Sequence, residues 1–158
     1  MSKHVVEVGW SRGEHEFTYL SYSCDHTWTF DGGDTVTASA NPAYLGSEAA
    51  VDPEEAFVAA LSSCHMLTLL AIAAKKRFVV NAYDDHAVGV MAKNEAGRLA
   101  ITTVTLSPQI VFAGAEPDAT LRCAAGLRRR PSARRTRISL AFSDRACSIM
   151  QLNSFPIV

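Results

Sequence analysis

The fold is decided by residues 51–77, VDPEEAFVAALSSCHMLTLLAIAAKKR. Asp52 is a favourable N-cap, Pro53 suits the first helical position, and the acidic residues after it oppose the helix dipole. No formal charge occurs at residues 56–74, and three basic residues at 75–77 close the segment. We therefore predict one long helix that is apolar on nearly all sides, which is typical of a buried central helix.

The apolar part of this segment is also about as long as a bilayer span. Four polar side chains interrupt its middle, namely Ser62, Ser63, His65 and Thr68. The N-terminal residues lack the uninterrupted apolar stretch of a secretory signal, and the rest of the chain alternates like the strands of a soluble protein. We therefore expect a cytoplasmic protein without a membrane span.

Before the helix, the chain shows the patterns of β-strands and tight turns. Residues 3–10 and 16–22 alternate between two faces, and a Ser-Arg-Gly turn separates them. Two further runs at 26–30 and 35–39 are rich in threonine and flank an Asp-Gly-Gly-Asp hairpin turn. These patterns predict an antiparallel meander within residues 1–50.

After the helix, two more segments have the composition of strands. Residues 79–90 and 99–111 alternate and are rich in β-branched side chains, and a polar turn at residues 93–97 separates them. This pattern predicts a second antiparallel meander over residues 78–114.

Residues 115–158 form a divergent, arginine-rich C-terminal segment. A short helix could begin near Pro117, but Gly126 and Pro131 interrupt any amphipathic pattern there. Taken together, the segments predict one α+β domain over residues 1–158, in which two antiparallel β-meanders surround the long buried helix.

Composition is that of an ordinary globular protein. The chain has 158 residues, of which 48% are hydrophobic and 20% are charged, so it can bury a core without a stabilising crosslink. Its four cysteines form no CxxC pair and are expected to be free thiols. Cys24 with His26, or Cys64 with His65, supplies two donors where zinc needs three or four, and we expect no metal and no other cofactor.

The net charge of −1 conceals an asymmetry. Residues 1–119 hold 7 of the 15 Lys and Arg but 15 of the 16 Asp and Glu, and the other eight basic residues, all arginine, lie at 120–158. Clustered arginine can attract phosphates. Because this run lacks interleaved aromatic residues and a reading helix, we expect a solvated tail and no nucleic-acid partner.

Two strings resemble a known family. VDPEEAFVAALSSCHMLTLLA at residues 51–71 resembles the central-helix motif of the OsmC/Ohr family of osmotically inducible and organic hydroperoxide resistance proteins. YSCDHTWTFDGG at residues 22–33 resembles an N-terminal segment of its OsmC-like branch. The resemblance implies an intertwined homodimer whose two long helices are wrapped by β-sheets. It also implies reduction of organic hydroperoxides or hydrogen peroxide by two cysteines, an arginine and a glutamate, without metal or flavin.

By position, the resemblance places the peroxide-reacting cysteine at Cys64 and the glutamate at Glu54. In such a site a thiolate attacks the peroxide and becomes a sulfenic acid, and a nearby arginine, oriented by the glutamate, would lower the thiol pKa. From the residues alone, Cys64 could also be a small apolar residue of a buried helix, and Glu54 an acid that stabilises the helix dipole.

Helix geometry separates these two residues. The ten residues from Glu54 to Cys64 span about 15 Å on a straight helix, so the side chains cannot meet. Either the helix starts after Glu54, or Glu54 serves the Cys64 of a partner chain. His65 points to another helix face, where a buried, hydrogen-bonded histidine is the expected role.

Two parts of the family's pattern differ here. Cys24 stands where the OsmC-like sequences have the arginine, and Arg12 in the preceding turn is the nearest replacement. The family's resolving cysteine lies on a late helix in a His-rich context, which neither Cys123 nor Cys147 matches. Cys123 is the preferred candidate by distance along the chain. The change in charge and the loss of periodicity after residue 120 are typical of a divergent tail or of a shifted reading frame.

These observations favour a thiol-dependent peroxidase of oxidative or osmotic stress defence that is regenerated by a second thiol or by an external thiol or dithiol reductant. The alternative is a catalytically impaired OsmC-like dimer with a structural or small-molecule-binding role.

Overall fold

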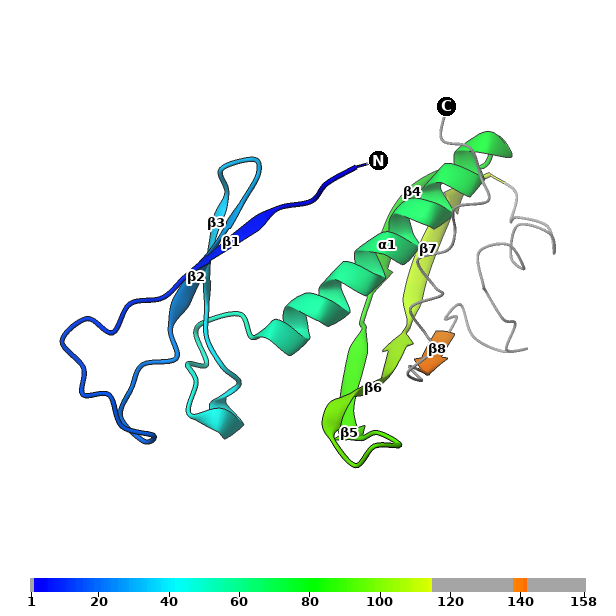
Figure 1. The fold of residues 1–158 in the computed structure, drawn as a ribbon. Coiled ribbons are helices and arrows are strands. Elements are labelled where there is room, and N and C mark those ends of the chain that lie inside the picture. The colour runs from blue at the N-terminus through cyan, green and yellow to red at the C-terminus, as the bar shows by residue number, and fades with distance from the viewer. Residues whose placement is uncertain (1, 115–137, 142–158) are drawn as a thin grey trace. The chain divides into compact units, whose positions relative to one another are not determined.

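The computed structural model describes residues 2–114 and 138–141 and has an α+β fold with one long helix and antiparallel strands, as predicted (Figure 1). The chain divides into two compact units, one up to Phe57 and one from Val58 onward. That the two units form a single domain stays a prediction. The elements are β1 (Val6–Gly9), β2 (His26–Phe30), β3 (Thr35–Ala38), the short 3₁₀ helix η1 (Pro42–Tyr44), α1 (Pro53–Lys75), β4 (Val79–Asp85), β5 (Val88–Lys93), β6 (Leu99–Leu106), β7 (Pro108–Ala113) and β8 (Ile138–Ala141).

In the first unit, β1, β2 and β3 form an antiparallel sheet in that order. The hairpin between β2 and β3 is confirmed at the predicted turn. Its backbone closes through Gly33, whose N–H donates to the carbonyl of Phe30 at 2.8 Å and whose φ of 87° suits glycine.

The predicted strand at residues 16–22 is wrong. These residues form turns, and β1 pairs directly with β2 across them. Local hydrogen bonds explain the difference, because the hydroxyls of Thr18 and Ser21 bond each other at 2.6 Å and Ser21 also donates to the carbonyl of Glu16 at 3.1 Å. Such side-chain bonds offer the backbone an alternative to a strand ladder.

Helix α1 begins where the sequence predicts. The carboxylate of Asp52 accepts the N–H of Glu55 at 2.7 Å, and the carboxylate of Glu55 accepts the N–H of Asp52 at 3.2 Å, which is a capping box. Asp52 is 5% exposed, and its second oxygen accepts from the Asn41 amide at 2.8 Å. The acidic first turn therefore has a structural role before any chemistry is considered.

The same helix ends after Lys75, two residues before the predicted end at Arg77. Arg77 has a φ of 61°, and the N–H of Phe78 donates to the carbonyl of Ala73 at 2.9 Å. This is the bonding of a helix that closes through a left-handed residue, and it turns the chain into β4.

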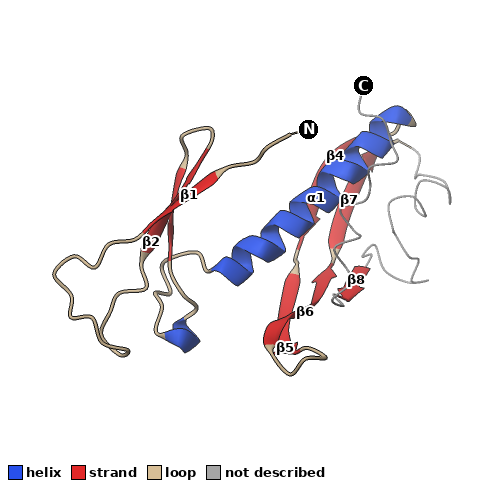
Figure 2. Cartoon of the chain, viewed as in Figure 1, coloured by secondary structure: helices blue, strands red, loops and turns tan. Residues whose placement is uncertain are grey.

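In the second unit, each of the two predicted strand segments is divided in two. The first becomes β4 and β5 and the second becomes β6 and β7, so that β4 pairs with β7 and β5 pairs with β6, all antiparallel (Figure 2). The predicted polar turn joins β5 to β6, where Asn94 Oδ1 accepts the N–H groups of Ala96 and Arg98, each at 3.0 Å. The second meander is thus confirmed. Each of its two long segments is interrupted once, between β4 and β5 and between β6 and β7.

The C-terminal segment contributes β8, which pairs antiparallel with β6. The short helix predicted near Pro117, and the cysteines at positions 123 and 147, lie outside the described residues.

The burial of α1 differs from the sequence prediction. A helix buried on nearly all sides was expected, but Leu69 and Ala73 are its two fully buried residues, and Leu67 is 60% exposed. The reason is that the strands of a single chain cover one face of the helix. Of the helices that the structure describes, α1 is long and apolar enough to cross a bilayer, which is weak evidence for a membrane span because core helices of soluble proteins share these properties.

Candidate functional site

Helix α1 has two different faces. The inner face consists of positions 58, 62, 65, 69 and 73, whose spacing of three or four residues places them in one stripe toward the strands of the second unit. The outer face lies opposite and is exposed. It consists of Ala60, Ser63, Cys64, Leu67, Ala71 and Ala74.

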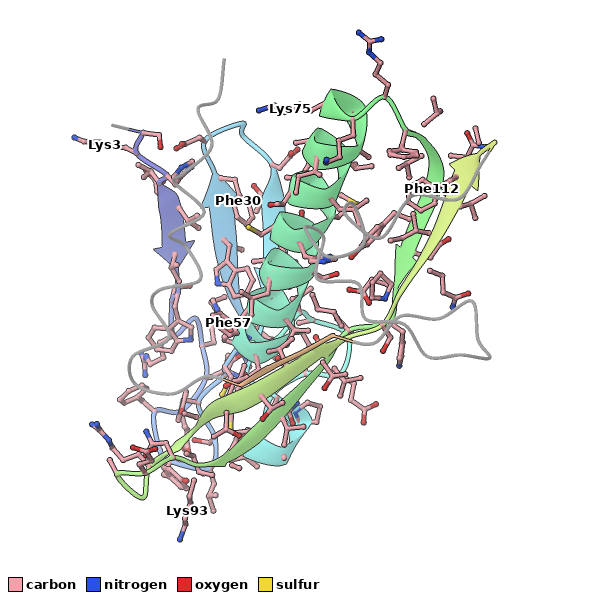
Figure 3. The ribbon with its side chains drawn as sticks, turned by 90° about the vertical axis from the view of Figure 1, so that its right-hand side faces the viewer. Lys3, Phe30, Phe57, Lys75, Lys93 and Phe112 are labelled. Carbon is pink, nitrogen blue, oxygen red and sulfur yellow. The ribbon has the colours of Figure 1, made fainter. Side chains whose placement is uncertain are left out.

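Cys64 lies in the middle of the outer face. Its thiol is free, and the residue is exposed in the single chain. The hydroxyl of Thr68 donates to the backbone carbonyl of Cys64 at 2.9 Å and occupies the next turn. No lysine or arginine occurs from Pro53 to Ala74, so the helix itself supplies no fixed cation beside this thiol before Lys75, which Figure 3 shows at the C-terminal end of α1.

On the inner face, a carboxylate of β4 holds the helix. The hydroxyl of Ser62 donates to Asp85 Oδ2 at 2.5 Å, and the backbone N–H of Ser107 donates to Asp85 Oδ1 at 2.6 Å. Asp85 is half-buried and joins three segments, namely α1, the end of β4 and the link between β6 and β7.

A second polar pair lies one turn along the helix. His65 Nδ1 is hydrogen-bonded to the hydroxyl of Tyr83 at 2.8 Å, and the two rings are tilted by 46° with centroids 6.1 Å apart. The prediction of a buried, hydrogen-bonded His65 is confirmed for the hydrogen bond, but the residue is half-buried rather than buried.

The surroundings of Tyr83 disfavour its ionised form. Burial and the nearby Asp85 carboxylate raise the pKa of Tyr83 to about 12, against a hydrogen bond with Ser62 that lowers it. Tyr83, which is protonated at neutral pH like any tyrosine, therefore keeps its proton further into the alkaline range.

Sequence reasoning did not identify Tyr83 or Asp85. The available signal was that the two residues alternate on one face of a β-branched strand, where a tyrosine and a carboxylate interrupt the apolar pattern. Only the pairing of α1 with β4 shows that these two residues meet Ser62 and His65.

Glu54 occupies the first turn of α1 and is half-buried. Because α1 starts at Pro53, the alternative in which the helix begins after Glu54 is excluded. Glu54 and Cys64 are therefore ten residues apart on one continuous helix, about 15 Å along its axis. The capping carboxylate is that of Glu55, so the side chain of Glu54 is not needed for the cap.

The first unit holds Arg12 and Cys24. Arg12 is exposed in the segment between β1 and β2, where its carbonyl accepts the N–H of His15 at 3.3 Å. Cys24 is half-buried with a free thiol, and interactions with this thiol raise the pKa of Tyr22, first through charge and then through a side-chain hydrogen bond. His26 Nδ1 is bonded to the Cys24 carbonyl at 2.8 Å.

Within residues 2–114 and 138–141, no three His, Cys, Asp or Glu side chains are grouped as metal ligands would be. The paired residues Cys24 with His26 and Cys64 with His65, which the sequence places next to each other, gain no third donor among the described residues.

Comparisons with known proteins concern the fold of this chain. Residues 46–130, which include all of α1, match the family model of the OsmC-like protein. The chain is similar to the solved structure of an OsmC-like protein of unknown function from Vibrio cholerae, with 49% sequence identity and a TM-score of 0.74 over 80% of this chain and 86% of that chain. A protein from Psychrobacter arcticus, named for osmotic stress induction and detoxification, is similar in fold, with 15% identity and a TM-score of 0.54 over 75% of this chain and 80% of that chain. A comparison with curated proteins gives no match.

Proposed function

Because this chain belongs to the OsmC-like protein family, we propose that it is a peroxidase that reduces organic hydroperoxides or hydrogen peroxide at Cys64. The observation that carries the proposal is that Cys64 is a free, exposed thiol on the outer face of the helix within the matched region. Within the single chain this thiol is not buried against the strands, unlike a structural cysteine of the core.

The chemistry balances with one thiol and one peroxide. The Cys64 thiolate attacks the outer oxygen of the peroxide, a sulfur–oxygen bond forms, and the O–O bond breaks. The leaving alkoxide or hydroxide takes a proton and departs as an alcohol or water. The sulfur, now oxidised, is a sulfenic acid.

A second thiol completes the cycle. It attacks the sulfenic acid, releases water and forms a disulfide, which an external thiol or dithiol reductant then reduces. Cys123 is the preferred candidate for the second thiol within the chain, and Cys147 is the other. A dithiol reductant can also react with the sulfenic acid directly.

We propose that the active form is a homodimer. The outer face of α1 is apolar and exposed in the single chain, and an apolar helix face of this length gains free energy when a partner covers it. In a dimer, the Glu54 carboxylate of one chain serves the Cys64 of the other, since the two cannot meet within one helix. A cation oriented by Glu54 would stabilise the thiolate. Arg12 is the candidate for this cation.

The site of action is proposed to be the cytoplasm, where reductants keep thiols available. The physiological role that follows is defence against oxidative or osmotic stress.

A second candidate function rests on the missing cation. Cys24 replaces the arginine expected from the family, and a thiol provides neither a permanent charge nor a paired set of donors. Helix α1 carries no cation near Cys64. This observation favours an OsmC-like dimer that has lost catalysis and keeps a structural or small-molecule-binding role.

Peroxide consumption distinguishes the two candidates. Purified wild-type protein, Cys64→Ser and the matched control Cys24→Ser are each given cumene hydroperoxide or hydrogen peroxide with dithiothreitol as reductant. The peroxidase predicts turnover that is lost in Cys64→Ser and retained in Cys24→Ser. Equal rates in the wild type and Cys64→Ser would reject the peroxidase and leave the second candidate.

A further inference from the structure

Four polar side chains of the second unit form one continuous chain of hydrogen bonds between α1 and β4. The hydroxyl of Ser62 is bonded to Asp85 Oδ2 at 2.5 Å, and Ser62 is also hydrogen-bonded to the side chain of Tyr83. The hydroxyl of Tyr83 is bonded in turn to His65 Nδ1 at 2.8 Å. Each hydroxyl has a single proton to donate, so the direction of one bond in the chain determines the direction of the next.

The direction of the chain is set at Asp85. As a carboxylate it only accepts hydrogen bonds, and its Oδ1 already accepts the backbone N–H of Ser107 at 2.6 Å. The proton in the bond between Ser62 and Asp85 is therefore the hydroxyl proton of Ser62. Because that proton is used, the Ser62 hydroxyl must act as the acceptor toward Tyr83.

Tyr83 consequently donates its hydroxyl proton to Ser62 and accepts a proton from His65. In the opposite arrangement Tyr83 would donate to His65, and the oxygens of Tyr83 and Ser62 would face each other without a proton between them. An arrangement that leaves such a bond unmade is costly. When the phenol ionises, Ser62 can turn its proton toward the phenolate, which agrees with the lowering of the pKa of Tyr83 by this bond.

We infer that Asp85 holds His65 in the tautomer that carries its proton on Nδ1, acting through the two hydroxyl groups between them, and that Nε2 of His65 is a proton-accepting site. The partner of one ring nitrogen determines which nitrogen of a histidine is protonated. When Nε2 takes up a proton, Nδ1 continues to donate to Tyr83, so His65 gains a charge without losing its bond to β4. This inference goes beyond the proposed function and does not involve Cys64.

Nitrogen-15 NMR of the imidazole ring tests the inference directly, because protonated and unprotonated ring nitrogens differ in chemical shift. The purified wild-type protein is measured at about pH 8.5, roughly two units above the ordinary histidine pKa of about 6.5, where the ring is neutral. The chain has five histidines, and the signal that disappears in His65→Gln is that of His65. We expect the Nδ1–H tautomer to exceed the Nε2–H tautomer by about tenfold. A wild-type His65 with its proton on Nε2 would overturn the inference.

Asp85→Asn should reverse the chain. The backbone N–H of Ser107 still needs an acceptor, so the amide oxygen of the new side chain stays with it and the amide nitrogen faces Ser62. An amide nitrogen donates, so Ser62 then donates to Tyr83, and Tyr83 donates to His65 Nδ1. The proton of His65 should therefore move to Nε2, which becomes the protonated nitrogen in the major tautomer.

Asp84→Asn is the matched control, since it makes the same change at the next residue of β4, which is exposed. It should leave the proton of His65 on Nδ1. His4 and His15 are exposed in the first unit, and their spectra should be the same in every variant. A general loss of the fold would alter all histidine signals together, whereas reversal of the chain alters the tautomer of His65.

Ser62→Ala interrupts the chain without removing a charge and serves if Asp85→Asn does not fold. The hydroxyl of Tyr83 is then free to donate to His65 or to accept from it, and we expect both tautomers in comparable amounts. Persistence of the proton on Nδ1 in folded Asp85→Asn or Ser62→Ala would overturn the inference, because Asp85 would then not control the tautomer.

Discussion

Gly89 of β5 lies against Val58 of α1 so closely that a methyl group on Gly89 would stand 2.5 Å from Val58 Cγ2. This is well inside van der Waals contact, and real side chains do not approach so closely. Because Gly89 has no side chain, it leaves space in β5 for Val58, which is the first inner-face residue of α1 in this unit.

Substitution Gly89→Ala should destabilise the protein by about 1–3 kcal/mol, since a side chain would be forced into a filled space. Denaturant unfolding measures the change. Val58→Ala in the same chain should recover part of the loss, because it removes the methyl group that would collide. Additive effects of the two substitutions would contradict the contact.

Substitution Leu67→Asp should convert the proposed dimer to a monomer. Leu67 is 60% exposed on the outer face of α1, and a charge there would have to be buried without a partner in the dimer. Leu99→Asp is the matched control, since Leu99 is 61% exposed but lies on β6. Sedimentation velocity should show the change in mass for Leu67→Asp alone. A dimer that survives this substitution would place the interface elsewhere.

Mixing two inactive variants tests whether Glu54 acts across the dimer. Glu54→Gln retains Cys64, and Cys64→Ser retains Glu54, so a mixed dimer holds one complete site if the residues come from different chains. After unfolding and refolding together in equal amounts, the mixture should regain about a quarter of the wild-type peroxidase rate, because half of the dimers are mixed. If the mixture is no more active than the average of the two separate variants, Glu54 acts on the Cys64 of its own chain.

Substitution Asp52→Ala should cost about 1–2 kcal/mol of stability, the usual effect of removing a helix N-cap. It would also leave the amide of Asn41 without its acceptor. Asp52→Asn keeps one oxygen for the N–H of Glu55 and should cost less. Thermal unfolding of the two variants gives the comparison, and equal stability of Asp52→Ala and the wild type would argue against the cap.

Stability should fall at alkaline pH partly through Tyr83. Its pKa is raised from 10.0 to about 12 in the fold, so between these values the unfolded chain loses its proton first and is favoured. The contribution is complete below pH 10 and is lost as the pH rises through about 12. Because the side chain is partly open to solvent, we expect less than about 1 kcal/mol between about pH 9 and about pH 11.

Tyr83→Phe should reduce this loss of stability, whereas Tyr44→Phe, at a tyrosine that is 53% exposed, should not. Denaturant unfolding at the two pH values measures the difference. The same pH dependence in the wild type and Tyr83→Phe would show that other groups cause it.

The predictions from sequence succeeded where the cause is local. The start of α1 follows from Asp52 and Pro53, and the hairpin before β3 follows from its Gly-Gly turn, because caps and turns depend on a few neighbouring residues. The strand predicted at residues 16–22 failed for the same kind of reason. There, the hydroxyls of Thr18 and Ser21 offered the backbone a competing local bond that alternation alone does not reveal.

By itself, the sequence determined the α+β class, the long helix and the position of Cys64 within it. The spacing of apolar residues, the helix cap and the apolar content can all be read directly from the sequence. Only the tertiary structure shows that Cys64 lies on the face turned away from the strands of the second unit, because the residues that bond to the other face come from elsewhere in the sequence. Asp85 and Tyr83 lie about twenty residues from the serine and histidine that they bind, and no local pattern pairs residues across that distance.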